Sequence, residues 1–66
     1  MQVYINGKVT DIPDALALSE LVILLELPAT RIAVEVNRVV VRRVDWEKTL
    51  LTNEDRVEIV QFVGGG

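Results

Sequence analysis

The sequence predicts a single two-layer α+β domain, in which one helix covers one face of a mixed sheet of four to five strands. Segments near both ends alternate apolar and polar residues with a period of two, which is typical of half-buried strands. A segment with helical spacing lies between them and ends at a proline. The 66 residues suffice for one domain only. We therefore expect the element order ββαβ(β)β.

An N-terminal β-hairpin is the first expected element. Apolar and polar residues alternate over residues 1–5, which places one face of this strand in a core. Asn6-Gly7 follows, and this dipeptide favours a two-residue hairpin turn because both positions tolerate positive φ. The return strand is expected at residues 8–10, and the segment 11–14 ends it.

One helix is expected from Ala15 to Leu27, because this segment consists of helix formers and Pro28 cannot continue a helix. Its core-facing residues recur at i, i+3, i+4 and i+7: Leu18, Leu21, Val22 and Leu25. Three further apolar residues lie off this stripe: Ile23, Leu24 and Leu27. Either loops or a slightly rotated helix cover them, or they form a second contact surface for a partner or for self-association.

More strands are expected after the helix. Alternation over residues 32–37 predicts one strand, and residues 39–41 form a β-branched run after a tight turn at Asn37-Arg38. The last strand is expected to run from Val57 to Val63. The first and last strands are the natural central pair, and if they are parallel the helix acts as a right-handed crossover between them.

The segment between these strands contributes to the core and to the surface. The indole of Trp46 is expected to cover one end of the core, and either Leu50 or Leu51 to pack inward from an irregular stretch. The run 53–55 predicts a turn. Arg42-Arg43 forms a small basic spot, which is either a solvated surface or a docking site.

Composition excludes several classes of function. The chain has no cysteine and no histidine, so it offers no disulfide, no thiolate metal site, no thiol nucleophile and no imidazole base. Its formal net charge of −3 disfavours nucleic-acid binding. Its apolar runs are too short to span a bilayer, and the N-terminus lacks the features of a secretory signal. We expect a soluble cytoplasmic protein without a metal site.

Gly64, Gly65 and Gly66 end the chain directly after an apolar strand. Such glycines are either an inert flexible tail or a segment that threads a passage too narrow for side chains. Extended, they reach roughly 10 Å, which suffices to deliver a carboxylate into a site on another protein. Attack of that carboxylate on the α-phosphate of ATP would expel pyrophosphate and give an acyl adenylate. The magnesium, the phosphate clamp and the attacking thiol would come from a partner.

Several short motifs are spread from one end of the chain to the other: Asn6-Gly7, Leu18-Ser19-Glu20-Leu21, Ile32-Ala33-Val34-Glu35-Val36-Asn37, Arg43, Trp46, Thr49-Leu50-Leu51, Asp55-Arg56-Val57-Glu58-Ile59-Val60 and Phe62-Val63-Gly64-Gly65-Gly66. In these residues the chain resembles, from end to end, the thiamine-biosynthesis sulfur carrier family (ThiS), a branch of the ubiquitin-like β-grasp proteins. The last twelve residues are the most specific part. The family often has Asn-Gly where this chain has Asn37-Arg38, so a different turn type is expected there.

The resemblance implies a β-grasp domain over residues 1–63, a flexible glycine tail over 64–66, and a carrier rather than an enzyme. A ThiF-type, E1-like enzyme would use ATP and Mg²⁺ to adenylate Gly66, while the chain itself binds no cofactor. A sulfur-relay protein would then convert Gly66 to a thiocarboxylate, and a ThiG-type thiazole synthase would take the sulfur to form the thiazole of thiamine.

By the β-grasp pattern, the last strand turns Val57 and Ile59 to the helix, and Val60 and Phe62 outward beside the tail. We expect Val60 and Phe62 to dock a partner, with simple edge packing as the alternative for Phe62. Three other functions stay open: the small subunit of molybdopterin synthase, a ubiquitin-like protein modifier joined through Gly66 to lysine, and a binding module with an inert tail.

Overall fold

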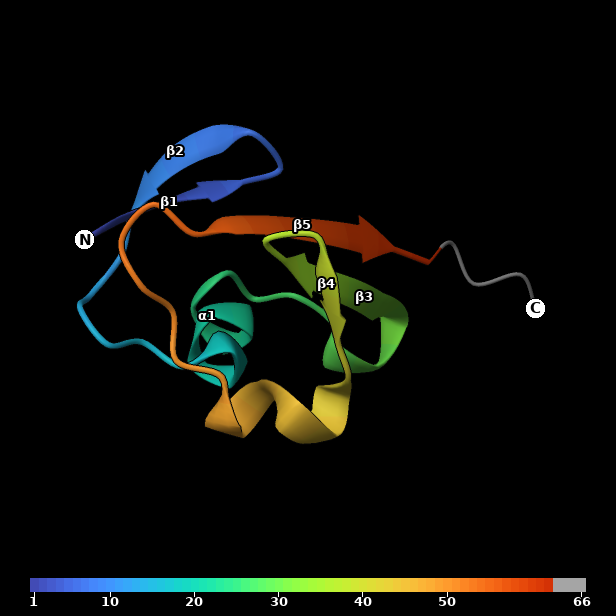
Figure 1. Ribbon diagram of the computed structural model, residues 1–66. Helices are drawn as coiled ribbons and strands as arrows, with labels where there is room; N and C mark the ends of the chain where they lie inside the picture. Colours follow the sequence, from blue (N-terminus) through green and yellow to red (C-terminus); the bar gives the residue numbers. More distant parts are fainter. Residues whose placement is uncertain (63–66) are drawn as a thin grey trace.

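The computed structural model describes residues 1–62, which form one mixed sheet with one α-helix on one face (Figure 1). In chain order the elements are β1 (Gln2–Ile5), β2 (Lys8–Asp11), α1 (Leu18–Leu24), the 3₁₀ turn η1 (Ala29–Arg31), β3 (Ile32–Val36), β4 (Val39–Val41), the 3₁₀ helix η2 (Arg43–Lys48) and β5 (Arg56–Gln61). The sheet has five strands in the order β2-β1-β5-β3-β4. The predicted α+β class and the predicted hairpin at the N-terminus are therefore confirmed.

The central strand of the sheet is β5. It pairs parallel with β1 and antiparallel with β3. The edge strands are β2, which pairs antiparallel with β1, and β4, which pairs antiparallel with β3. The parallel pairing of the first and last strands, which the sequence predicted conditionally, is present. Figure 1 shows β5 crossing the domain and leading to the C-terminal end of the described chain.

The core lies between α1 and the inner face of the sheet. The helix contributes Leu18, Leu21 and Val22, as the helical stripe predicted, and Leu25 packs at its margin. The sheet contributes three fully buried valines, one from each central strand: Val3, Val34 and Val57. Burying side chains of this size contributes about 1.5–3 kcal/mol each, so this cluster dominates the stability of so short a chain.

Trp46 covers one end of the core, as predicted. It lies in η2, a 3₁₀ helix that the sequence did not predict, and its exposed fraction is only 4%. Its indole Nε1 donates a hydrogen bond to the carbonyl of Val41 at 2.9 Å, so the one polar atom of the ring is satisfied. Of the two candidate leucines, Leu51 is buried and Leu50 is 61% exposed.

The helix is shorter than predicted at its N-terminal end: it begins at Leu18 and not at Ala15. Ala15 has a φ of 57°, and Ala17 is extended and bridges to Leu50. The amide of Leu18 donates to Thr49 at 2.8 Å. These contacts between segments distant in sequence override the helix propensity of the alanines.

The helix is also shorter at its C-terminal end, where it stops at Leu24. Glu26 has a φ of 55°, and its backbone amide donates a hydrogen bond to the carbonyl of Ile23 at 3.0 Å. The amide of Leu27 donates to the carbonyl of Val22, also at 3.0 Å. These two bonds form a Schellman motif with Glu26 in the position that glycine usually takes. A local C-cap, rather than Pro28, therefore ends the helix.

The expectation of a different turn type at Asn37-Arg38 is wrong. Asn37 has a φ of 51° and Arg38 of 69°, much as Asn6 and Gly7 have 50° and 81°. The register pairs Val36 with Val39, which leaves a loop of only two residues. Such a loop matches the twist of its strands best with both residues at positive φ, so the pairing imposes this conformation on an arginine.

The apolar residues that lie off the helical stripe differ in their environment. Ile23 is 75% exposed and Leu24 is 54% exposed, so the expectation that loops or helix rotation cover them is wrong for these two. Leu27 is partly buried against the core. Arg42 and Arg43 are exposed, in agreement with a solvated surface.

The last strand ends at Gln61, not at Val63. Phe62 follows the strand, and its amide still donates to the carbonyl of Arg31 at 2.7 Å. Val63 lies outside the described residues. Within residues 1–62, no helix is both long enough and apolar enough to cross a membrane.

Candidate functional site

The expected reactive end of the chain comprises Gly64, Gly65 and Gly66, all of which lie outside the described residues. The site in the described part is therefore the surface that leads to them, which is the outer face of β5 and its neighbours. It is the face of the sheet that α1 leaves uncovered (Figure 1).

Side chains alternate along β5 as expected. Val57 is fully buried and Ile59 packs against the core, whereas Glu58, Val60 and Phe62 point outward. Val60 is 60% exposed and Phe62 is 53% exposed. The outward orientation of these two residues is confirmed, and their docking role stays a prediction.

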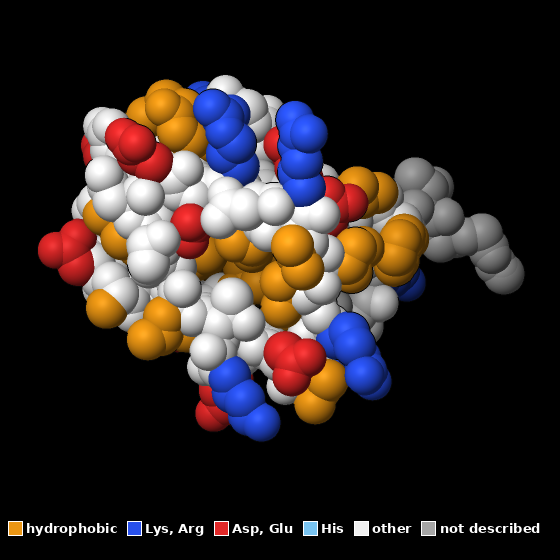
Figure 2. Space-filling view, viewed as in Figure 1, with side chains coloured by type: hydrophobic (Ala, Val, Ile, Leu, Met, Phe, Trp, Pro, Cys, Tyr) orange, Lys and Arg blue, Asp and Glu red, His pale blue; other side chains and the backbone are white. Residues whose placement is uncertain are grey.

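The outer face combines apolar and acidic side chains. The register between β3 and β5 places Ala33 opposite Val60 and Glu35 opposite Glu58. On the other side of β3, Val40 of β4 lies opposite Glu35. Figure 2 shows acidic and hydrophobic side chains next to one another near the C-terminal end of β5.

The opposite end of this face carries the one cation–π pair found within residues 1–62. Arg56 of β5 and Tyr4 of β1 are cross-strand partners, and the guanidinium carbon lies 4.6 Å from the centroid of the tyrosine ring. Val9 of β2 is paired with Tyr4. This contact holds the guanidinium of Arg56 over β1.

Two asparagines fix β5 from its two sides. Asn6 accepts a hydrogen bond from the amide of Ile59 through Oδ1 at 2.7 Å, and its Nδ2 donates to the carbonyl of Ile59 at 3.2 Å. Asn37 accepts from the amide of Arg56 through Oδ1 at 2.9 Å. The sequence identified both asparagines as turn residues. It could not predict their side-chain hydrogen bonds to β5, because no pattern among neighbouring residues indicates a contact with a distant strand.

Asp55 anchors the loop before β5. Partial burial raises its pKa, but three donors to its carboxylate outweigh this effect: the Thr52 amide, the Asn37 side-chain amide and the Thr52 hydroxyl. The pKa of Asp55 is therefore lowered from its ordinary value of 3.8. These hydrogen bonds let the carboxylate stabilise the start of β5, and they do not indicate a role for Asp55 in proton transfer.

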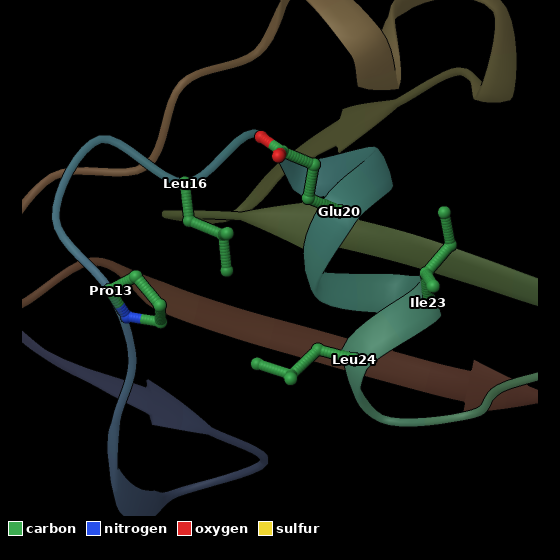
Figure 3. Close-up of a pocket in the computed structure, with 5 residues that line it drawn as sticks. All are labelled: Pro13, Leu16, Glu20, Ile23 and Leu24. Atoms are coloured by element: carbon green, nitrogen blue, oxygen red, sulfur yellow. The ribbon is translucent and has the colours of Figure 1, made fainter.

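The helix side of the domain carries a shallow groove of about 330 Å³. It is lined by Pro13, Leu16, Glu20, Ile23 and Leu24. Figure 3 shows Pro13, Leu16 and Leu24 pointing toward one another, whereas Ile23, the residue before Leu24 in α1, lies farther from them. The Glu20 carboxylate accepts a bond from the amide of Ala17 at 2.9 Å, so it acts as a helix cap. Within residues 1–62, no cluster of acidic side chains is arranged to hold a metal ion.

These features define the class of the protein. A five-stranded mixed sheet in the order β2-β1-β5-β3-β4, with β1 parallel to β5 and one main helix on one face, is the ubiquitin-like β-grasp fold. The chain belongs to the ThiS family, whose model matches residues 3–66.

Individual relatives agree with this assignment. The structure of the thiamine biosynthesis protein ThiS from Geobacter metallireducens is similar with a TM-score of 0.88 at 32% identity, over 100% of both chains. The uncharacterized protein ycf40 of Trieres chinensis is 30% identical over 63 residues, which cover 96% of this chain and 86% of that protein. A thiazole synthase of Magnetococcus marinus is 32% identical over 66 residues, which cover 100% of this chain but only 20% of that protein.

Proposed function

We propose that this chain is a sulfur carrier protein of thiamine biosynthesis, and that Gly66 carries the sulfur as a thiocarboxylate. The observation that carries the proposal is the match to the ThiS family, which extends through the terminal glycines to residue 66. The likeness in fold to a thiamine biosynthesis protein over its whole length supports it.

The chemistry begins with the Gly66 carboxylate, which is ionised at neutral pH. One carboxylate oxygen attacks the α-phosphorus of ATP, and pyrophosphate leaves, so Gly66 becomes an acyl adenylate. A persulfide sulfur of a relay protein then attacks the carbonyl carbon and displaces AMP. A second thiol of the relay protein then attacks that protein's own cysteine sulfur and breaks the remaining sulfur–sulfur bond, which leaves a thiocarboxylate on Gly66 and a disulfide on the relay protein.

A partner supplies the catalytic groups in this scheme. The chain has no cysteine and no histidine, so the attacking sulfur and any imidazole base belong to other proteins. A ThiF-type adenylating enzyme holds ATP and Mg²⁺, and this chain presents its carboxylate as a co-substrate. Glycine suits this role because it lacks Cβ and leaves its carbonyl open to attack.

Docking to that enzyme uses the outer face of β5. Val60 and Phe62 are exposed there and lie within four positions of the first terminal glycine in sequence. An exposed aromatic residue four positions before the reacting carboxylate in sequence can anchor the chain where the carboxylate enters the partner. The hydrogen bonds of Asn6 and Asn37 to β5 keep this strand in place during docking.

A ThiG-type thiazole synthase is the proposed sulfur acceptor. A sequence similar to this chain forms 20% of a protein named thiazole synthase in Magnetococcus marinus. Two activities joined in one polypeptide act at a high effective concentration, which suits a carrier and its acceptor.

The test is the intact mass of the chain after incubation with a ThiF-type enzyme, Mg-ATP and a sulfur donor. The expected result is a gain equal to the exchange of one oxygen for sulfur, and no gain in a variant that lacks Gly65 and Gly66. Wild-type chain that keeps its mass under these conditions contradicts the proposal. Stable conjugates to lysine would instead identify a protein modifier, and sulfur delivery to a molybdopterin precursor would identify the other carrier class.

A further inference from the structure

Two carboxylates face each other on the outer surface of the sheet. Glu35 of β3 and Glu58 of β5 are direct cross-strand partners. Both belong to the outward-facing set of their strands, because Val34, Val36 and Val57 face inward. Residues in such a pair have Cβ atoms about 5 Å apart, and like charges at that separation repel. The free domain therefore carries an unfavourable pair at the centre of its open face.

No Lys or Arg of the described chain forms an ion pair with either carboxylate. Within residues 1–62, the one ion pair joins the N-terminal ammonium to Asp14. Arg56 lies on the same face of β5, but its guanidinium stacks over Tyr4 on β1, which is on the side of β5 away from β3.

Apolar side chains frame the two carboxylates. Val40 lies opposite Glu35 on one side and is 66% exposed. Val60 is the next outward residue along β5 after Glu58, and Ala33 lies opposite it. When a partner covers these residues it removes water from around the carboxylates, which strengthens their attraction to a cation.

We propose that Glu35 and Glu58 together receive one basic side chain from the surface of the adenylating partner. The inference rests on the proposed function and adds the charge of the partner's surface to it. An arginine fits best, because its planar guanidinium donates on several sides and packs well against apolar neighbours. The pair thereby selects a partner with a cation at this point, whereas the apolar residues alone set no such requirement.

The test uses Glu35→Gln, Glu58→Gln and the double variant, with Glu47→Gln as the matched control. Glu47 lies in η2, which packs beside α1 and away from the open face, and its change removes the same charge. The readouts are the melting temperature of the free chain and its Kd for a ThiF-type enzyme at low and high salt.

The two readouts are expected to move in opposite directions. Removing the repulsion raises the melting temperature by about 1–4 °C, while loss of the cation partner weakens binding by roughly tenfold and flattens its salt dependence. Glu47→Gln is expected to change neither by a comparable amount. Binding by the double variant that equals the control in affinity and salt dependence overturns the inference.

A kinetic arm separates this inference from the proposed function. At saturating enzyme, the double variant is expected to form thiocarboxylate at the wild-type rate, so that KM rises and kcat does not change. If wild-type chain is charged and the variants behave like the control, the inference alone fails. If wild-type chain gains no sulfur, the proposed function fails, whatever the variants bind.

Discussion

The side chain of Asn6 makes a two-bond bridge to the backbone of Ile59, 53 residues further along the chain. Its Oδ1 accepts from the amide of Ile59 at 2.7 Å and its Nδ2 donates to the carbonyl of the same residue at 3.2 Å. The bridge begins where β1 ends, so the turn of the first hairpin continues the pairing with β5. The β3–β4 turn does the same from the other side, where Asn37 pairs with Arg56.

Replacing Asn6 with glycine isolates the contribution of this bridge. Glycine accepts the φ of 50° without strain, so the turn is retained while both side-chain bonds are lost. We expect the free energy of unfolding to fall by about 1–2 kcal/mol, as measured by urea denaturation. Asn6→Ala is expected to lose more, because alanine also strains the turn. Equal stability of Asn6→Gly and wild type would mean that the bridge contributes nothing.

Glu26 and Arg38 hold positions that favour glycine. Their φ values are 55° and 69°, and neither side chain makes a hydrogen bond or ion pair within residues 1–62. We expect Glu26→Gly and Arg38→Gly each to stabilise the domain by about 0.5–1 kcal/mol in thermal denaturation. The control is Ser19→Gly inside α1, which is expected to destabilise by a similar amount. Destabilisation by all three changes would show that flexibility of the unfolded chain outweighs the backbone strain.

The sequence predicted correctly the features that neighbouring residues determine, and it failed for features that depend on contacts with residues distant in the chain. The helical stripe of Leu18, Leu21 and Val22 was correct, because its period of 3.6 is set by neighbours along the chain. The start of the helix was wrong, because the extended conformation of Ala17 depends on Leu50. The turn at Asn37-Arg38 was wrong for the same reason: pairing across the hairpin imposes a φ that the arginine does not favour.

The same distinction between local and long-range features applies to the candidate site. Alternation and the family pattern predicted that Val60 and Phe62 face outward, and the structure agrees. The pairing of Glu35 with Glu58 could not be predicted, because it depends on the register between β3 and β5. A shift of one residue would turn either carboxylate to the other face of the sheet.

The two adjacent leucines after η2 offer a matched pair of substitutions, because the sequence alone could not say which of them is buried. Leu51 is 2% exposed and Leu50 is 61% exposed. Leu51→Ala leaves a cavity in the core and is expected to cost about 2–4 kcal/mol of unfolding free energy. Leu50→Ala is expected to change stability by less than about 0.5 kcal/mol. Similar losses for both changes in chemical denaturation would contradict the observed arrangement.

Acid titration should show the contribution of Asp55. Its pKa is lowered in the folded chain from the ordinary value of 3.8, so the unfolded state takes up the proton first as pH falls. The stability that the carboxylate contributes is therefore complete well above pH 3.8 and is lost as pH falls through the folded pKa. We expect Asp55→Asn to be less stable than wild type at pH 7 and to show a shallower decline in melting temperature between neutral and acidic pH. Parallel profiles for the two proteins would remove Asp55 as a source of the decline.

Val60 and Phe62 provide the most direct test of docking on the outer face. Both side chains are largely exposed, so Val60→Ala and Phe62→Ala are expected to leave the melting temperature nearly unchanged. In adenylation by a ThiF-type enzyme we expect KM to rise by about tenfold for Phe62→Ala and less for Val60→Ala, because the larger aromatic surface contributes more at an interface. Val44→Ala is the control, since Val44 is 66% exposed but lies in η2 and away from this face. If Phe62→Ala and Val44→Ala give the same KM, then Phe62 only packs at the edge of the sheet, and the partner approaches the glycines from another side.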